Sequence, residues 1–190
     1  MNATQAQALV AGGRQAMQAQ AELQQYLTFT LGTEVFGIDI LHVKEIIEYA
    51  GLTEVPLMPA MIRGVINLRG AVVPVIDLAL RFGHARTEIA RRTCIVIIEV
   101  ESEEDRHDVG ILVDAVNEVL EISSAEIEPA PAFGAKIRTD FIAGMGKVEG
   151  RFVILLNVAQ VLSVEEMALL AGMGAGGGSE ALPAPVAHTI

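Results

Sequence analysis

The side chains of this 190-residue chain that could do chemistry are scattered, and their spacing matches no common catalytic pattern. Its four histidines lie in separate segments, and none has a second histidine, a cysteine or an acidic residue at a spacing typical of metal ligands. Phosphate-binding GxxxxGK[ST] loops, GxSxG nucleophile elbows and HExxH zinc motifs do not occur. The sequence therefore predicts no catalytic residue, no metal site and no cofactor.

Two aspartates and one cysteine remain as candidates for chemistry. Asp77 and Asp114 could be imagined as paired carboxylates, but Asp77 closes an apolar run. At such a position an aspartate usually accepts hydrogen bonds from the backbone N–H groups that follow. Cys94 lies in an alternating apolar segment, which favours a buried strand residue over a reactive thiol. A single cysteine also allows no internal disulfide and no cysteine-based metal cluster.

Composition limits the partners of the chain. Hydrophobic residues make up 52% of it, enough for one sizeable core or for two smaller cores that share a wall. The formal net charge of −11 disfavours binding to a nucleic-acid backbone or to an anionic membrane surface, because both attract cationic proteins. No apolar run approaches the roughly 20 residues that cross a bilayer, and no signal peptide is recognisable. We expect a cytoplasmic protein that binds no nucleic acid and inserts into no membrane.

The elements that must position any site centre on the stretch from Ile62 to Leu78, which predicts a tight β-hairpin. Arg69 and Gly70 separate two apolar runs, and Gly70 would supply the positive φ angle that a tight turn needs. Pro74 lies within the second run and has no N–H group, so we expect its strand at a sheet edge or at a bulge. One side of the hairpin is then not fully paired.

The hairpin pattern occurs twice in the chain, about eighty residues apart. Ile62, Gly64, Gly70, Val72, Val75, Asp77 and Leu78 are matched in the same order and spacing by Ile142, Gly144, Gly150, Phe152, Leu155, Asn157 and Val158. A second match aligns Gly37-Ile38, Glu45-Ile46 and Glu48 with Gly110-Ile111, Glu118-Val119 and Glu121. The chain is therefore predicted to hold two divergent copies of one small β unit, since solenoid repeats are shorter.

The segments between these patterns are also predicted to be mainly strands. Residues 26–31 and 35–40 read as a first hairpin, and residues 93–100 as a strand buried on both faces. Residues 41–48 fit a helical turn or a strand, and we favour a strand with Val43, Glu45 and Ile47 on one face. Glu45 is then either an interaction point or a solvated edge charge.

Further boundaries follow from composition. Residues 80–92 are expected to separate the two copies, residues 101–108 to form a solvated loop, and residues 109–121 to be core strand throughout. Residues 1–24 are expected to be a flexible arm with a frayed helix over 14–25, or else a partner-binding helix. A capping box at Ser163 and Glu166 predicts a terminal helix over 163–171, followed by a disordered Gly-rich tail over 172–190.

Several segments in continuous register carry a resemblance to a known family. They are Phe29-Thr30-Leu31-Gly32, Gly37-Ile38-Asp39-Ile40, Ile62-Arg63-Gly64-Val65-Ile66-Asn67-Leu68-Arg69-Gly70 with Pro74 and Asp77-Leu78, Gly110-Ile111-Leu112-Val113-Asp114, and Glu165-Glu166-Met167-Ala168-Leu169-Leu170. Over roughly residues 24–171 the chain resembles the CheW family of chemotaxis coupling proteins. The resemblance implies a mainly β fold of two tandem five-stranded SH3-like β-barrels packed side by side. Their bounds would be about 25–90 and 91–162, with the terminal helix after them.

The resemblance also implies a function and a site. It implies an adaptor without enzymatic activity that joins the cytoplasmic tip of transmembrane chemoreceptors to the regulatory domain of the histidine kinase CheA, with CheW–CheW contacts in rings. The receptor-contacting residues that it implies are Arg69, Ile40, Val43, Glu45, Cys94 and Val119. An alternative of another class is a small-ligand-binding protein, or an unrecognised hydrolase, that uses the cleft between the barrels.

Overall fold

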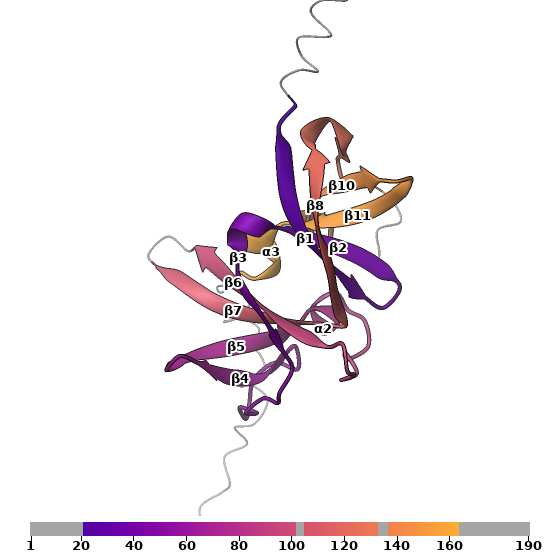
Figure 1. Ribbon diagram of the computed structural model, residues 1–190. Helices are drawn as coiled ribbons and strands as arrows, with labels where there is room; N and C mark the ends of the chain where they lie inside the picture. Colours follow the sequence, from indigo (N-terminus) through magenta and orange to yellow (C-terminus); the bar gives the residue numbers. More distant parts are fainter. Residues whose placement is uncertain (1–20, 102–104, 133–136, 164–190) are drawn as a thin grey trace, which may run out of the picture.

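The computed structural model describes residues 21–101, 105–132 and 137–163, and strands make up most of this part (Figure 1). The strands are β1 (Leu23–Leu31), β2 (Glu34–Asp39), β3 (Val43–Glu48), β4 (Ile62–Leu68), β5 (Ala71–Asp77), β6 (Cys94–Glu101), β7 (Arg106–Val113), β8 (Ala115–Ser123), β9 (Ile127–Glu128), β10 (Ile142–Val148) and β11 (Arg151–Leu156). The helices are α2 (Leu78–Arg81), α3 (Val158–Val161) and the 3-10 turns η1 (Ile40–His42), η2 (Ser124–Glu126) and η3 (Thr139–Phe141).

These strands form two sheets. One has five strands in the order β3-β6-β7-β5-β4, and the other has six in the order β8-β1-β2-β11-β10-β9. The hairpin of β10 and β11 lies at the opposite end of the molecule from the hairpin of β4 and β5 (Figure 1). The predicted fold class, mainly β with two packed β units, is confirmed.

Each sheet is closed into a barrel by the chain segment that follows one of its edge strands, which is β3 in one sheet and β8 in the other. In the five-stranded sheet, Thr53 follows β3 and bridges to Val65 of β4 at the opposite edge, with N–O distances of 2.9 and 2.8 Å. In the other sheet, β9 follows β8 and pairs with β10. The closing segment passes so close to Gly64 that a Cβ there would lie 2.5 Å from the Thr53 carbonyl oxygen. This close approach explains why glycine stands at position 64, and at the equivalent position 144, where a Cβ would lie 2.6 Å from Ile127.

The two copies exchange their first hairpins. The hairpin of β1 and β2, which belongs to the first copy, lies between β8 and β11 of the second copy. The hairpin of β6 and β7, which opens the second copy, lies between β3 and β5 of the first. The predicted assignment of residues 25–90 to one barrel and 91–162 to the other is therefore wrong for the sheets. A separation between copies near residue 90 does exist, because no strand occurs between β5 and β6.

The predicted duplication agrees with the pairing registers. In the β4–β5 hairpin the register shifts between Ile62 and Gly64, and in the β10–β11 hairpin it shifts at the equivalent place. Both turns have two consecutive residues with positive φ, 52° and 87° at Arg69 and Gly70, and 50° and 76° at Glu149 and Gly150. Two such angles match the right-handed twist of a two-residue hairpin.

Pro74 limits the pairing of β5, although β5 is not an edge strand. It pairs with β4 from Ala71 to Ile76, but its parallel ladder with β7 begins only at Val75, directly after Pro74. The missing N–H group therefore falls where one side of β5 has no ladder partner. The prediction of an incompletely paired hairpin is right, and β4 is the outer strand.

One shared core and two smaller cores hold the sheets together. The shared core joins Phe29 and Phe36 of one sheet to Val96 and Ile98 of the other. Four phenylalanine rings run through it, with neighbouring centroids 6.0, 5.4 and 6.0 Å apart. Each fully buried side chain of this size contributes about 1.5–3 kcal/mol to the free energy of unfolding. A smaller cluster fills the interior of each sheet.

Several local predictions can be compared with the described residues. The strand over residues 43–48 is confirmed with its alternating burial, whereas Ile40–His42 form a 3-10 turn. Residues 23–25 belong to β1, so the predicted arm and frayed helix extend too far. Asp114 divides the predicted strand over 109–121 into β7 and β8, and β7 takes up the end of the predicted loop over 101–108. Residues 1–20 and 164–190, which hold most of the arm, the terminal helix and the tail, lie outside the described residues.

Candidate functional site

Arg69 and Glu45 meet across the seam where the five-stranded sheet closes. Arg69 lies in the turn between β4 and β5, and Glu45 lies on β3 at the opposite edge of the sheet. Arg69 Nη2 donates to Glu45 Oε2 over 2.9 Å, while the arginine side chain stays 79% exposed. An ion pair this exposed adds little stability. Its main effect is to orient the guanidinium beside β3, where it remains open to a partner.

Three further predicted site residues lie against the shared core. Ile40 precedes β3, Val43 begins it, and Cys94 begins the neighbouring strand β6. Each is partly buried and packs against the shared core. Cys94 is therefore a half-buried strand residue, and its thiol donates to the backbone carbonyl of Arg92 over 3.4 Å. We expect these residues to set the shape of the surface beside Arg69.

Val119 lies on a different sheet from the other predicted site residues. It pairs with Leu27 at the edge of the six-stranded sheet, and its side chain is 46% exposed. The duplication aligns it with Ile46 of β3, which is 43% exposed. Sequence reasoning missed Ile46 as a site candidate, although the match of Glu45-Ile46 with Glu118-Val119 could have indicated it. The two end strands therefore present equivalent exposed apolar residues.

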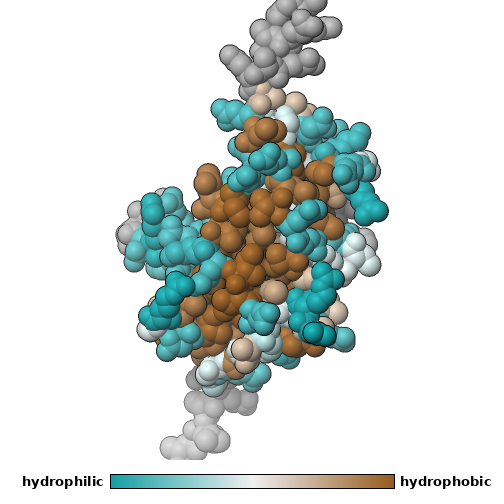
Figure 2. All heavy atoms as spheres, in the orientation of Figure 1, coloured by the Kyte–Doolittle hydropathy of each residue, from teal (hydrophilic) through white to brown (hydrophobic). Residues whose placement is uncertain are grey.

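An apolar band crosses the face of the molecule on which β1, β3, β6 and β8 are seen (Figures 1 and 2). Hydrophilic residues flank this band on both sides (Figure 2). An apolar strip with polar margins is typical of a surface that binds another protein. The band lies over the strands that carry Val43, Glu45, Cys94 and Val119.

Asp77 and Asp114 do not form a pair of catalytic carboxylates. Asp77 is fully buried, and it accepts hydrogen bonds from the backbone N–H groups of Ala79 and Thr87 at 3.1 and 2.9 Å. It also forms a buried ion pair with Arg63 at 2.8 Å. Asp114 accepts a hydrogen bond from the backbone N–H of Gly32 at 2.7 Å. The predicted capping role of Asp77 is confirmed, and both carboxylates hold backbone segments in place.

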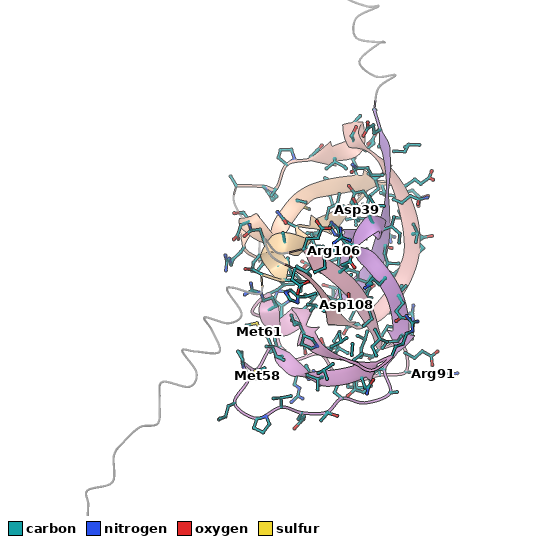
Figure 3. The ribbon with its side chains drawn as sticks, turned by 90° about the vertical axis from the view of Figure 1, so that its left-hand side faces the viewer. Asp39, Met58, Met61, Arg91, Arg106 and Asp108 are labelled. Carbon is teal, nitrogen blue, oxygen red and sulfur yellow. The ribbon has the colours of Figure 1, made fainter. Side chains whose placement is uncertain are left out.

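A groove of about 710 Å³ lies within the five-stranded sheet, where β5 and β7 diverge. We call it the β5–β7 groove; Val72, Val73 and Met58 line it together with charged side chains that pair with one another. Arg106 and Asp108, which line this groove, lie near the middle of the view in Figure 3, and Met58 lies lower. It is not a cleft between the two sheets, where the alternative function was expected.

The charged groups of this groove neutralise one another. Lys44 Nζ lies 3.2 Å from Glu99 and 2.9 Å from Asp108, and Arg106 lies 3.3 Å from Glu99, so two cations face two carboxylates among the lining residues. Hydrogen bonds to Asp108 and Glu99 raise the pKa of Lys44 above its ordinary value. The rim of the groove therefore consists of balanced ion pairs.

Comparison with known proteins agrees with this architecture. The family model of the CheW-like domain matches residues 25–166. The chain belongs to the CheW-like family. The chemotaxis protein CheW of Klebsiella aerogenes is 40% identical over 147 residues, which cover 77% of this chain and 86% of that protein. The chemotaxis protein CheW of Rhizobium meliloti is 35% identical over 143 residues, covering 75% and 90%.

A solved structure extends the CheW-like assignment to three dimensions. The crystal structure of the scaffolding protein TtCheW from Thermoanaerobacter tengcongensis superposes with a TM-score of 0.68 at 34% sequence identity. The match covers 75% of this chain and 94% of that one. In the described part of this CheW-like chain, no helix is both long and apolar enough to cross a membrane.

Proposed function

We propose that this CheW-like chain is a chemotaxis scaffold without enzymatic activity, which couples the cytoplasmic tips of chemoreceptors to the histidine kinase CheA. Relatives named as chemotaxis proteins CheW and as a scaffolding protein match most of the chain, which supports the role. The geometry of Arg69 is the structural observation that supports the proposal most strongly. This arginine is anchored by Glu45 and still exposed, at the margin of partly buried apolar residues.

The receptor surface consists, in this proposal, of Arg69, Glu45, Ile40, Val43, Cys94 and Val119. A receptor tip is helical, so its apolar stripe would lie along the apolar band while the Arg69–Glu45 pair fixes its register. Because Ile46 is the structural equivalent of Val119, we add Ile46 to this surface. The regulatory domain of CheA binds elsewhere on the same molecule, so that both partners are held together.

Each of these contacts is modest in area, and many copies in an array supply the strength. A standard interface buries about 800 Å² per partner, and we expect each contact of this chain to bury less. Contacts between copies in rings would raise the effective concentration of every partner. An array of weak contacts also lets a small change in the receptor shift the state of many kinases.

The experiment is a kinase autophosphorylation assay with receptor signalling tips and CheA from the same organism. We expect the wild-type chain to raise the rate, and Arg69→Glu to remove both the increase and the co-sedimentation with receptors. Arg91→Glu, which makes the same charge change at another exposed position, is the matched control and should behave as wild type. A wild-type chain that neither binds the two partners nor changes the rate would contradict the proposal.

A second function, small-ligand binding, is favoured by the size of the β5–β7 groove. Its volume of about 710 Å³ falls within the roughly 300–1,000 Å³ of ordinary ligand pockets. A thermal-shift screen with metabolites and nucleotides separates the two functions. Stabilisation by about 2 kcal/mol or more, with ligand well above its Kd, would favour the pocket.

A further inference from the structure

The six-stranded sheet contains a structural twin of the β5–β7 groove. It opens where β2 and β11 diverge, has a volume of about 600 Å³, and is lined by Val35, Leu120, Met145 and Phe152. We call it the β2–β11 groove. The duplication places Phe152 at the position of Val72 in the other groove. Phe152 is 51% exposed, so a large aromatic ring stands partly uncovered in the groove.

The two grooves differ in charge. The duplication aligns Lys44 with Asn117 and Arg106 with Thr33, so the β2–β11 groove has neutral residues in place of both cations that balance its twin. Three carboxylates line it instead, those of Glu34, Glu118 and Glu149. Within residues 21–101, 105–132 and 137–163, none of the three is in an ion pair. One cation, Arg151, also lines the groove. The rim keeps an excess of negative charge that its twin lacks.

The backbone along this groove is open to a further strand. The parallel ladder between β2 and β11 comprises only Phe36 with Ile154 and Gly37 with Leu155. On the N-terminal side of Phe36, the backbone groups of Glu34 and Val35 have no ladder partner on β11 in the described part of the chain. The twin groove carries Pro74 at the position of Ile154, and a proline has no N–H group to donate. Ile154 has that N–H group and belongs to the β2–β11 ladder, so the β2 backbone beside this groove that has no ladder partner on β11 is that of Glu34 and Val35.

We propose that the β2–β11 groove docks an extended segment of another protein, in which apolar side chains alternate with lysine or arginine. The apolar side chains would cover Phe152 and Met145, and the cations would meet Glu34, Glu118 and Glu149. Strand addition of this kind draws affinity from main-chain hydrogen bonds and specificity from alternate side chains. Val119 and Arg69 do not line the groove, so an occupant of the groove would leave these two side chains uncovered for a receptor.

The test measures fluorescence anisotropy with the full chain and a fluorescein-labelled peptide in which leucine alternates with lysine. We expect Phe152→Asp to weaken binding at least about tenfold, because it places a carboxylate against the apolar side chains. Val72→Asp, the same change in the twin groove, should leave the Kd within about twofold. A peptide with serine in place of leucine, and one with glutamate in place of lysine, should bind at least about tenfold more weakly.

Charge reversal keeps the test decisive if Phe152→Asp fails to fold. Glu118 and Glu149 are exposed, so Glu118→Lys with Glu149→Lys should fold and should switch the preference to the glutamate peptide. Chemical shifts of backbone amides along β2 and β11 should move when the lysine peptide binds. The proposal is overturned if the wild type does not bind this peptide, if the serine peptide binds equally well, or if Val72→Asp weakens binding as much as Phe152→Asp. Equal binding of the serine peptide would mean that net charge alone attracts basic peptides, and equal weakening by Val72→Asp would mean that the peptide does not distinguish the two grooves.

Discussion

The Arg69 guanidinium lies 2.9 Å from the Glu45 carboxylate, although the two residues come from opposite edges of one sheet. The pair can form only because the sheet closes into a barrel. The position of Arg69, the most exposed residue of the proposed receptor surface, therefore depends on closure of the barrel.

The charge-swapped variant, Arg69→Glu with Glu45→Arg, separates the two roles of this pair. Each single substitution should lower the free energy of unfolding by no more than about 1 kcal/mol, because the arginine is mostly exposed. The double variant should regain that stability but not receptor co-sedimentation, because a receptor recognises the position of the cation. Recovery of receptor binding by the swap would show instead that the pair only shapes the surface. Urea unfolding and co-sedimentation give the two readouts.

Removal of the buried charge at Asp77 should be far more costly than changes at the surface. Asp77→Asn retains a cap for α2 but leaves Arg63, whose side chain is only 8% exposed, without a charged partner. We expect a loss of about 3–5 kcal/mol in urea unfolding. The matched control is Asn157→Ala, which removes the equivalent cap of α3 and should cost about 1 kcal/mol. A loss of only about 1 kcal/mol for Asp77→Asn would mean that the buried ion pair contributes no more than one cap does.

Two glycines of the β4–β5 hairpin should respond differently to alanine. At Gly70 a Cβ meets no atom within 4 Å, so Gly70→Ala carries only the strain of its positive φ, about 1–2 kcal/mol. At Gly64 the Cβ would also press on the Thr53 carbonyl, and we expect a loss of about 2–5 kcal/mol. Thermal unfolding of the two variants under one condition tests the order. A smaller loss for Gly64→Ala would show that the Thr53 segment moves aside easily.

Tyr26 should make stability depend on alkaline pH. Burial, and next the charge of Asp39, raises the pKa of Tyr26 above the ordinary value of 10.0. The folded chain then holds the phenolic proton longer than the unfolded chain. The associated stability is full below pH 10.0 and is lost as pH rises through the folded pKa.

The difference between the absorbance titrations of the wild type and Tyr26→Phe should have its midpoint above 10.0. In urea unfolding, Tyr26→Phe should lose less stability than the wild type as the pH rises from about 9 to about 11. Identical pH dependence of the two proteins would contradict this assignment.

Much of the fold could be predicted because local chemistry determines it. Gly70 and Gly150 end two apolar runs at equal spacing, and both adopt the positive φ of a hairpin turn. Asp77 closes a strand and caps the helix that follows. The sheet to which each strand belongs could not be predicted. Alternating apolar residues show that one face of a strand is buried. They do not show which copy buries it, because the two copies are similar enough that either could pack against that face.

The candidate site, like the fold, could be predicted from the sequence only in part. Arg69 and Glu45 were both named as site residues, yet their contact depends on the closure of the barrel, which no local pattern encodes. Ile46 was overlooked because it alternates with the inward-facing residues of β3, and its exposure depends on which side of the strand the core covers. Pairing the two copies position by position would have placed it beside Val119.

The exchange of first hairpins makes this chain an internal domain swap, equivalent to a two-fold dimer joined into one polypeptide. In this fold the hairpin of β6 and β7, and not that of β1 and β2, completes the barrel of β3, β4 and β5. A chain cut in the loop near residue 90 should therefore yield two fragments that fold only when they associate. The long separation in sequence between β1 and β8 further implies slow folding, since both barrels close together after distant segments have met.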